Sequence, residues 1–185
     1  MKLVLFGPPG AGKGTQASKI SAHYNIAHLS TGDIFRSAIK NETSLGKEVK
    51  SILDSGELVP DQTVVDLVAE ELKKESYKSG YILDGFPRTV AQAEAFDSLL
   101  EKQNDSIDAF ISLNVPEDEL IKRILSRGEG RSDDTEEGVK RRLQVYHKET
   151  RPVKEYYEKS GVVFNIEGVG SVEEIFSRIK SVLDK

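Results

Sequence analysis

The chain has 185 residues, a length that suits one domain with a hydrophobic core of its own. Its 26 Lys and Arg residues against 31 Asp and Glu residues give a formal net charge of −5, so the overall charge favours neither nucleic acid nor a membrane surface as a partner. The sequence contains no cysteine and no apolar run of membrane-spanning length, which excludes a disulfide framework and a cysteine-based zinc site and argues against a membrane span.

The first predicted element is a strand at residues 2–6, and a glycine-rich loop follows it directly. The loop reads Gly7-Pro8-Pro9-Gly10-Ala11-Gly12-Lys13-Gly14-Thr15 and leads into a helical pattern. It matches the phosphate-loop pattern G-x-x-x-x-G-K-[ST] up to Lys13, but Gly14 replaces the hydroxyl residue and Thr15 comes one position later. In such a loop the backbone N–H groups, the positive end of the helix dipole and the lysine ammonium converge on an anion. The stretch therefore predicts a polyphosphate site, whereas the dinucleotide fingerprint G-x-G-x-x-G fails because Thr15 stands at its third glycine.

Beyond this loop, short apolar runs alternate with helical patterns. We expect strands at residues 2–6, 26–29, 81–83, 109–113 and 162–166. These runs are almost continuously apolar, as is typical of strands that are buried on both faces. The alternation predicts an α/β fold with a five-stranded parallel sheet flanked by helices, in which the carboxyl ends of the strands and their loops lie along one edge.

Two stretches do not fit plain crossovers between strands. Residues 30–59 predict a small helical insertion, with one helix after Thr31 and a second that ends near Gly56. The polar segment from Gly128 to Asp134 separates two strong helical patterns, and loops of this kind on a rigid scaffold often serve as lids. We therefore expect a single core domain over residues 1–185, with an insertion at 30–59 and a short lid at 126–134.

Asp84 follows the predicted strand at 81–83 and is a candidate for metal chemistry. In a phosphate-loop protein this is the usual position of an acid that holds Mg²⁺ directly or through water. The acid gains importance here because no hydroxyl follows Lys13 immediately. The structural alternative is a turn residue at the end of a strand.

Arginines form a second group of candidates, consisting of Arg36, Arg88, Arg123, Arg127, Arg131 and Arg142. Each of them alone would be interpreted as a solvated surface charge, but guanidinium groups bind phosphate oxygens in pairs and stay charged. Phosphoryl transfer to a hydroxyl needs a positioned base, whereas transfer to a phosphate does not. Several arginines without an obvious base therefore favour a phosphate acceptor over a sugar.

Some of the same residues also fit helix-capping patterns. Thr89 with Gln92, and Ser30 with Asp33, have the spacing of a capping box, so Gln92 and Asp33 have a structural alternative. The segment 171–174 is interpreted as capping alone. The three histidines show no partner spacing, and we assign them no catalytic role.

Taken together, four segments of the chain resemble the adenylate kinase family. These segments are Gly7 to Thr15, Leu29 to Arg36, Asp84 to Gln92 and Arg131 to Asp134, and the resemblance spans the whole chain. It implies a P-loop NTPase-like three-layer fold with a helical monophosphate-binding insertion and a lid. It also implies reversible phosphoryl transfer from Mg-ATP to AMP giving two ADP, so that ATP, ADP, AMP and Mg²⁺ are the expected small-molecule partners.

The resemblance further implies a role for individual positions. At the ATP it implies Gly10, Ala11, Gly12, Lys13, Gly14 and Thr15 around the phosphates, Arg127 stacked on the adenine, and Gly170 meeting the base through its carbonyl. At the AMP it implies Thr31, Arg36, Glu57, Leu58, Val59, Gly85, Phe86, Pro87, Arg88, Gln92, Arg131 and Arg142. The implied catalytic set is Lys13, Arg88, Arg123, Arg131, Arg142 and Asp84, with Arg131 and Arg142 clamping phosphates and Asp84 reaching Mg²⁺ through water. Asp133 and Asp134 would meet arginines when the lid closes.

The chain resembles the short-lid members of the family, because its lid segment is brief and the four metal-binding cysteines of long-lid members are missing; we expect no structural zinc. We also expect a cytoplasmic protein, since the chain enters a strand at once without a signal-peptide pattern. We expect a monomer because no heptad or exposed apolar stripe favours assembly, and the net charge gives no reason to expect nucleic acid or a membrane as a partner. Two alternatives stay open. A UMP/CMP kinase tends to have alanine where Thr31 stands and asparagine where Gln92 stands, and a nucleotide-binding switch protein would carry an Asn-Lys-x-Asp stretch, which this sequence lacks.

Overall fold

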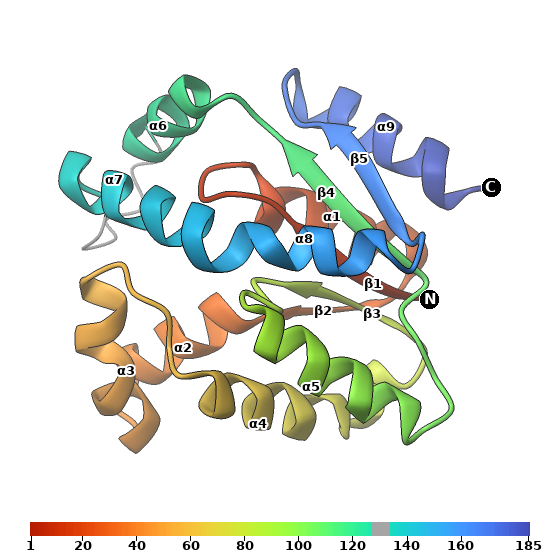
Figure 1. Ribbon diagram of the computed structural model, residues 1–185, viewed down its shortest axis with the longest axis horizontal. Helices are drawn as coiled ribbons and strands as arrows, with labels where there is room; N and C mark the ends of the chain where they lie inside the picture. The colour runs from red at the N-terminus through yellow and green to blue at the C-terminus, as the bar shows by residue number, and fades with distance from the viewer. Residues whose placement is uncertain (127–133) are drawn as a thin grey trace.

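The computed structural model describes residues 1–126 and 134–185, and its centre is a parallel sheet (Figure 1). The five strands are β1 (Lys2–Phe6), β2 (Ala27–Ser30), β3 (Tyr81–Asp84), β4 (Ala109–Asn114) and β5 (Val163–Glu167). They lie in the order β2-β3-β1-β4-β5, and all neighbouring pairs are parallel. The five predicted strands are confirmed, with ends that differ from the expected ones by no more than one residue.

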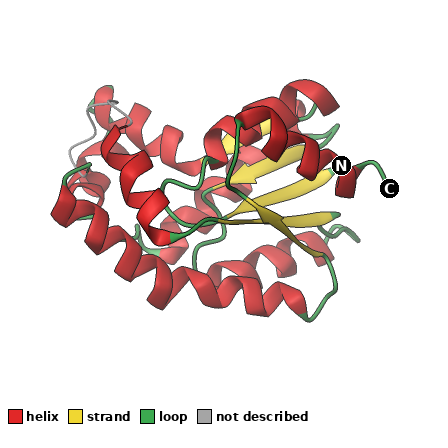
Figure 2. Cartoon of the chain, turned by 90° about the horizontal axis from the view of Figure 1, so that it is seen from above, coloured by secondary structure: helices red, strands yellow, loops and turns green. Residues whose placement is uncertain are grey.

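Helices cover both faces of this sheet, which confirms the three-layer α/β fold (Figure 2). The α-helices are α1 (Lys13–Tyr24), α2 (Thr31–Lys40), α3 (Ser44–Asp54), α4 (Asp61–Leu72), α5 (Val90–Glu101), α6 (Glu117–Ser126), α7 (Glu136–Val145), α8 (Arg151–Glu158) and α9 (Val172–Leu183). A 3₁₀ turn, η1 (Glu75–Tyr77), precedes β3, and a π-helical segment, η2 (Tyr146–Thr150), joins α7 to α8 without a break.

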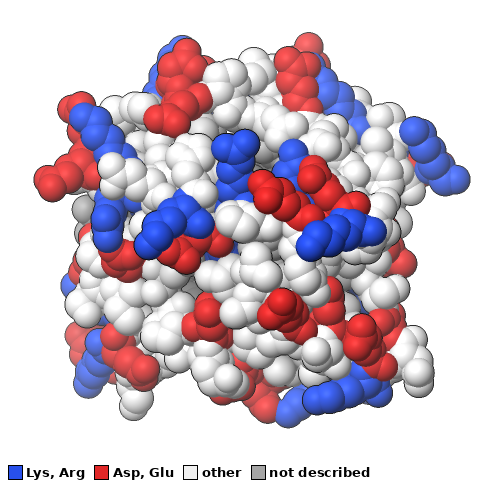
Figure 3. Space-filling model, in the orientation of Figure 1, with Lys and Arg blue, Asp and Glu red and all other residues white. Residues whose placement is uncertain are grey.

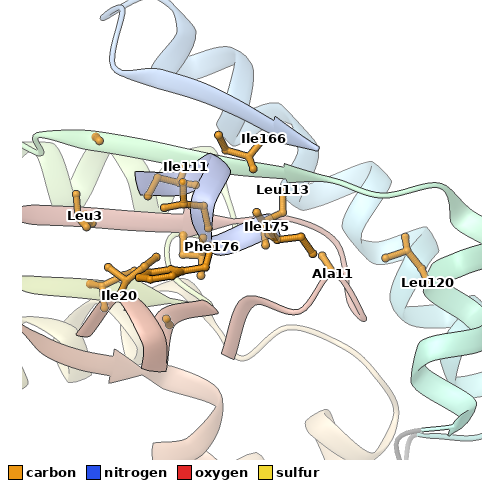
Figure 4. Packing of buried hydrophobic residues seen from close by; sticks show 14 of the residues in the cluster. Leu3, Ala11, Ile20, Ile111, Leu113, Leu120, Ile166, Ile175 and Phe176 are labelled. Carbon is orange, nitrogen blue, oxygen red and sulfur yellow. The ribbon is translucent and has the colours of Figure 1, made fainter. Parts of the chain in front are cut away.

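Alternation along the strands divides the core into two parts. Leu3 and Leu5 of β1 belong to one hydrophobic cluster and Val4 and Phe6 to the other, because successive side chains of a strand point to opposite faces. Helices α1 and α9 pack on the first face, where Ile20 and Phe176 meet the strand residues (Figure 4). The second face is covered by α4, α5 and α8. Both faces of the sheet are thus buried, as the continuously apolar strands predicted.

The stretch at 30–59 consists of α2 and α3, which pack against each other. The side chain of Ser30 caps α2 by accepting a hydrogen bond from the Asp33 N–H at 3.2 Å, as its spacing predicted. Helix α3 ends at Asp54, and the positive φ of 74° at Gly56 lets the Gly56 and Glu57 N–H groups bind the carbonyls of Leu53 and Ile52. Residues 57–59 then lead from this terminator to α4, and Val59 among them is buried in the second hydrophobic cluster.

Acidic and basic side chains are interspersed on the face shown in Figure 3, with no extended area of one sign. Within residues 1–126 and 134–185, no helix has both the length and the apolar character that crossing a membrane requires.

Candidate active site

One large cavity lies at the carboxyl ends of the strands and has a volume of about 890 Å³. Its walls come from the phosphate loop after β1, the α2–α3 insertion, the turn after β3, and helices α6 and α7 with the π-helical segment. In Figure 1 the phosphate loop lies between α6 and α7 on one side and α2 and α3 on the other. The volume falls in the upper part of the range of about 300–1,000 Å³ typical of ligand pockets.

The phosphate loop is built tightly against the helix that follows β4. A Cβ atom on Gly10 would lie 2.8 Å from Ile124 Cγ1 and 2.9 Å from the Leu120 carbonyl oxygen, and φ at Gly10 is +82°. Only glycine therefore fits this position without displacing α6. The Lys13 ammonium donates to the carbonyls of Gly7 at 2.8 Å and Pro8 at 3.0 Å. Its positive charge therefore lies against the start of the phosphate loop.

Asp84 ends β3 beside the first turn of α1, and its residue is only 8% exposed. A Cβ atom on Gly14 would lie 3.7 Å from Asp84 Oδ2, so the position that departs from the loop motif faces this carboxylate. His28 of β2 places its Nε2 3.5 Å from the same oxygen. Sequence spacing gave no sign of this histidine–carboxylate pair, because it depends on the parallel pairing of β2 with β3.

The turn after β3 is held by hydrogen bonds to a single carbonyl. Gly85 O accepts from Thr31 Oγ1 at 3.0 Å and from Arg88 Nε at 2.8 Å. Thr31 and Arg88, both predicted at the AMP, are therefore fixed against the same backbone atom. This arrangement connects the start of α2 to the turn and orients Arg88 along the cavity wall.

Gln92 makes different contacts from those of a capping box. Thr89 caps α5 as expected, since its hydroxyl accepts from Gln92 N at 3.1 Å. The Gln92 side chain, however, accepts from Arg88 N at 2.8 Å, not from the N–H of the cap residue, and its Nε2 donates to Asp61 Oδ1 at 2.9 Å. The reciprocal half of the capping box is therefore wrong for Gln92. At the segment 171–174 both halves are present, as predicted.

Three of the predicted arginines have carboxylate partners near the cavity. Arg36 bonds Asp33 at 2.5 Å, Arg123 bonds Glu119 at 2.8 Å, and Arg142 bonds Asp134 at 2.9 Å. Burial acts to raise the pKa of Asp33, but hydrogen bonds to Arg36 and Ser30 and the Arg36 charge outweigh it, so this pKa lies below its usual value. These carboxylates hold the guanidinium groups in place at the cavity wall.

Helix α7 also meets the insertion directly. Arg141 Nε donates to Glu57 Oε1 at 2.8 Å, and a second guanidinium nitrogen contacts the same oxygen. Next to this pair, a Cβ atom on Gly56 would lie 3.1 Å from Arg142 Cγ. The two walls of the cavity therefore touch at residues 56–57.

Most of the site residues predicted from the sequence line this one cavity. They are Gly10, Gly12, Lys13, Gly14, Thr15, Thr31, Arg36, Glu57, Leu58, Val59, Asp84, Gly85, Phe86, Pro87, Arg88, Gln92, Arg123 and Arg142. Ala11 is buried beneath the loop with 1% exposure, and Gly170 lies outside the lining, in the loop between β5 and α9. Arg127, Arg131, Asp133 and most of the expected lid at 126–134 lie outside the described residues.

Besides His28, the charged residues near the site that were not predicted include Asp61, Arg141 and Arg178. Arg178 donates to the carbonyls of Glu167 at 2.8 Å and Val169 at 2.6 Å, which fixes the loop that carries Gly170. Asp61 is the first residue of α4, where an acid is expected for helix stability alone. No pattern in the sequence distinguishes these residues from ordinary surface charges, because their partners are distant along the chain.

Comparison with known proteins gives a consistent family. A sequence model of the family described as "Adenylate kinase" matches residues 5–162. An adenylate kinase of Leptospira biflexa is 47% identical over 180 residues, which cover 96% of this chain and 97% of the relative. Similar proteins of the same name occur in Carboxydothermus hydrogenoformans, with 44% identity over 214 residues, and in Archaeoglobus fulgidus, with 42% over 214 residues. These two alignments cover 100% of this chain and 100% and 99% of the relatives.

Proposed function

Because the chain belongs to the adenylate kinase family and transfers a phosphoryl group between ATP and AMP to give two ADP, we propose that the two ends of its cavity bind the two nucleotides. The observation that carries the proposal is the continuity of the cavity, which reaches from the phosphate loop to Gln92 and residues 57–59. Cationic side chains lie along it from several different elements. Two polyanions can thus meet in one cavity that has cationic side chains along its length.

At the end formed by the phosphate loop, ATP binds through Gly10 to Thr15. The left-handed backbone at Gly10 and Gly12, the start of α1 and the Lys13 ammonium support this assignment, since together they direct positive charge at one place. Arg127 and the Gly170 carbonyl take the adenine. Arg123 supports the second contact because its guanidinium donates to Gly168 O at 3.1 Å and so connects the Gly170 loop to the cavity.

At the other end, AMP binds among the insertion, the turn after β3 and α5. The residues are Thr31, Arg36, Glu57, Leu58, Val59, Gly85, Phe86, Pro87, Arg88 and Gln92, all of which line the cavity. Arg36 and Arg88 bind its phosphate, and Gln92 meets its base. The Thr31 and Gln92 side chains distinguish this site from that of a pyrimidine kinase.

Between the two ends, Lys13, Arg88, Arg123, Arg131 and Arg142 hold the phosphates in line. The acceptor phosphate is already an anion near neutral pH, so no side chain has to remove a proton from it. The main difficulty is the repulsion between two polyanions, and fixed guanidinium groups in a partly enclosed cavity offset it. The ion pairs of Arg123 and Arg142 support this role because they keep both groups in position before substrate binds.

Proteins of this family use ATP with Mg²⁺, and the residues present fit that ion. Mg²⁺ prefers hard oxygen ligands and keeps several waters, so a single carboxylate beside the phosphate loop suffices on the protein side. Asp84, next to Gly14, supplies that oxygen through water, and the exposed Thr15 hydroxyl lies on the same wall of the cavity. When bound, the ion neutralises charge on the transferring phosphate. Within residues 1–126 and 134–185 no group of three or more potential metal-binding side chains occurs, and we propose that the protein has no structural zinc.

We further propose that residues 30–59 form the monophosphate-binding unit and residues 126–134 a short lid on a core spanning residues 1–185. The alignment with the Carboxydothermus relative runs over 214 positions, whereas this chain has 185 residues. This chain is therefore shorter than that relative, which supports a short lid. Closure of the lid excludes water, which would otherwise accept the phosphoryl group. The protein acts as a cytoplasmic monomer that binds nucleotides but neither nucleic acid nor membrane.

The proposed assignment is tested by measuring ADP formation from ATP plus AMP, with and without Mg²⁺. We expect turnover that requires Mg²⁺, a preference for AMP over CMP and UMP, and a loss of about a hundredfold or more in Asp84→Asn. In that variant the stability and the affinity for Mg-free ATP should change little. Undiminished turnover by Asp84→Asn would show that this carboxylate has no part in metal binding.

A further inference from the structure

Gln92 is fixed in one orientation by groups on either side of its carboxamide. Its residue is 1% exposed, and its Oε1 accepts from the Arg88 N–H at 2.8 Å while its Nε2 donates to Asp61 Oδ1 at 2.9 Å. Reversing the amide would place an NH₂ group against an N–H donor and an oxygen against a carboxylate. Both contacts would be repulsive, so the sense of the amide follows from its neighbours.

Asp61 is the side chain that, together with the Arg88 N–H, sets this orientation. It is half-buried at the start of α4 and is not part of the cavity lining, whereas its partner Gln92 is, so it acts on a ligand through the residues that it holds. The same Asp61 oxygen also accepts from Thr89 Oγ1 at 2.9 Å. The aspartate therefore connects the start of α4 to the first turn of α5, with two donors on one oxygen.

The fixed amide has a definite hydrogen-bonding sense toward the cavity. One Nε2 hydrogen is used by Asp61, so the other one remains as a donor, and Oε1 keeps a second lone pair as an acceptor. Adenine and cytosine present a ring-nitrogen acceptor next to an amino donor, and this pattern complements the amide as it is held. Hypoxanthine, guanine and uracil present a ring N–H next to a carbonyl, and that pattern complements only the reversed amide.

We propose that Asp61 is a positioning residue that fixes the sense of the Gln92 carboxamide and thereby makes the acceptor site select amino bases over oxo bases. The inference rests on the proposed function in one respect, namely that Gln92 faces the base of the monophosphate. Beyond that function, Asp61 sets the selectivity, and the site distinguishes amino bases from oxo bases. Aspartate suits this role because it can only accept hydrogen bonds when ionised, whereas an amide in its place could do either.

The test compares AMP with IMP as acceptors in Asp61→Asn and in the parent protein, with Asp66→Asn as the matched control. Asp66 lies on the same helix, is exposed and bonds only Gln62 at 2.7 Å among the residues described, so its replacement makes the same change of charge away from Gln92. In Asp61→Asn, the AMP-to-IMP ratio of kcat/KM should fall by at least about tenfold. The change should appear in the KM for the monophosphate, with the KM for ATP unaltered. Asp66→Asn should keep the parent ratio.

Binding of AMP and IMP measured by calorimetry without ATP supplies a readout independent of turnover, and the same ratio should fall there. If Asp61→Asn weakened both monophosphates equally, with a lower unfolding temperature and an unchanged ratio, Asp61 would be purely structural and the inference would be overturned. A third variant, Gln92→Leu, distinguishes the contact of Gln92 with the base from the positioning of Gln92 by Asp61. If it leaves the AMP-to-IMP ratio unaltered, Gln92 does not meet the base and the proposed function fails at this residue; if it alters the ratio while Asp61→Asn does not, only the positioning role fails.

Discussion

At the scale of single residues, Arg142 combines two tasks. Its side chain is 15% exposed and pairs with Asp134, whose side chain is 11% exposed. The second Asp134 oxygen is buried and has no hydrogen-bond partner among the residues described. Removing the guanidinium therefore leaves a buried carboxylate without compensation, which is costly. Arg142, which is proposed to bind phosphate, therefore also stabilises the fold.

For Arg142→Ala we therefore expect two effects, a loss of turnover of about a hundredfold or more and a fall in stability of about 1–3 kcal/mol. The double variant Arg142→Ala/Asp134→Asn should regain most of the stability, because the unpaired charge is gone, but not the turnover. Thermal unfolding and the ADP assay measure the two separately. Recovery of turnover in the double variant would show that Arg142 serves only to neutralise Asp134.

At the scale of elements, helix α7 and the α2–α3 insertion are connected by the ion pair of Arg141 with Glu57. The pair joins residues 84 positions apart in sequence and lies beside the backbone proposed to meet AMP. Its side chains are 51% and 40% exposed, so its energy is modest and sensitive to salt. A contact of this strength adjusts how the two walls approach each other without holding them permanently.

Reversing either charge of this pair should raise the KM for AMP by up to about fivefold at low salt, with kcat changed less. The exchanged pair, Glu57→Arg with Arg141→Glu, should restore most of the loss. At high ionic strength the single variants and the parent should converge, because screening weakens the pair in the parent and the repulsion in the variants. Losses that simply add in the exchanged variant would mean that the two side chains act independently of each other.

At the scale of the whole molecule, the tyrosines together make the stability of the fold depend on alkaline pH. The chain has six tyrosines, and the pKa of every one is raised: Tyr24, Tyr77, Tyr81, Tyr146, Tyr156 and Tyr157. Burial is the largest cause in each case, and hydrogen bonds to Asp97 add to it for Tyr156 and Tyr157. The pKa reaches about 12 for Tyr24, Tyr146 and Tyr156.

These shifts fix the sign of the pH dependence. A tyrosine in the unfolded chain loses its proton near pH 10, whereas in the folded protein the pKa of Tyr24, Tyr146 and Tyr156 is raised to about 12. The stabilisation is therefore complete below pH 10 and is lost as the pH rises through 12. We expect the free energy of unfolding to fall steadily between these values. Phenolate absorbance at 295 nm is a clean probe because the chain has no tryptophan, and ionisation near pH 10 in the folded protein would contradict the expectation.

Features that depend on local pattern and on residue chemistry could be predicted from the amino-acid sequence. The glycine spacing from Gly7 to Gly12, the continuous apolar strands and the cap at Ser30 each follow from backbone freedom or periodicity within a few residues. The arginines and the lack of an obvious base indicated a phosphate acceptor through charge alone. All of these features can be recognised without knowing which elements become neighbours.

The contacts that hold the functional side chains in place could not be predicted in this way, because they form between elements that are distant along the chain. Asp61 resembles an ordinary acid at a helix start until α4 lies against α5 and its oxygen meets Gln92, 31 residues away. His28 reaches Asp84 only because β2 pairs with β3, and Arg141 reaches Glu57 only because α7 meets the insertion. The physical reason is the short range of hydrogen bonds and ion pairs, which act over a few ångströms between groups that the packing of the elements brings together.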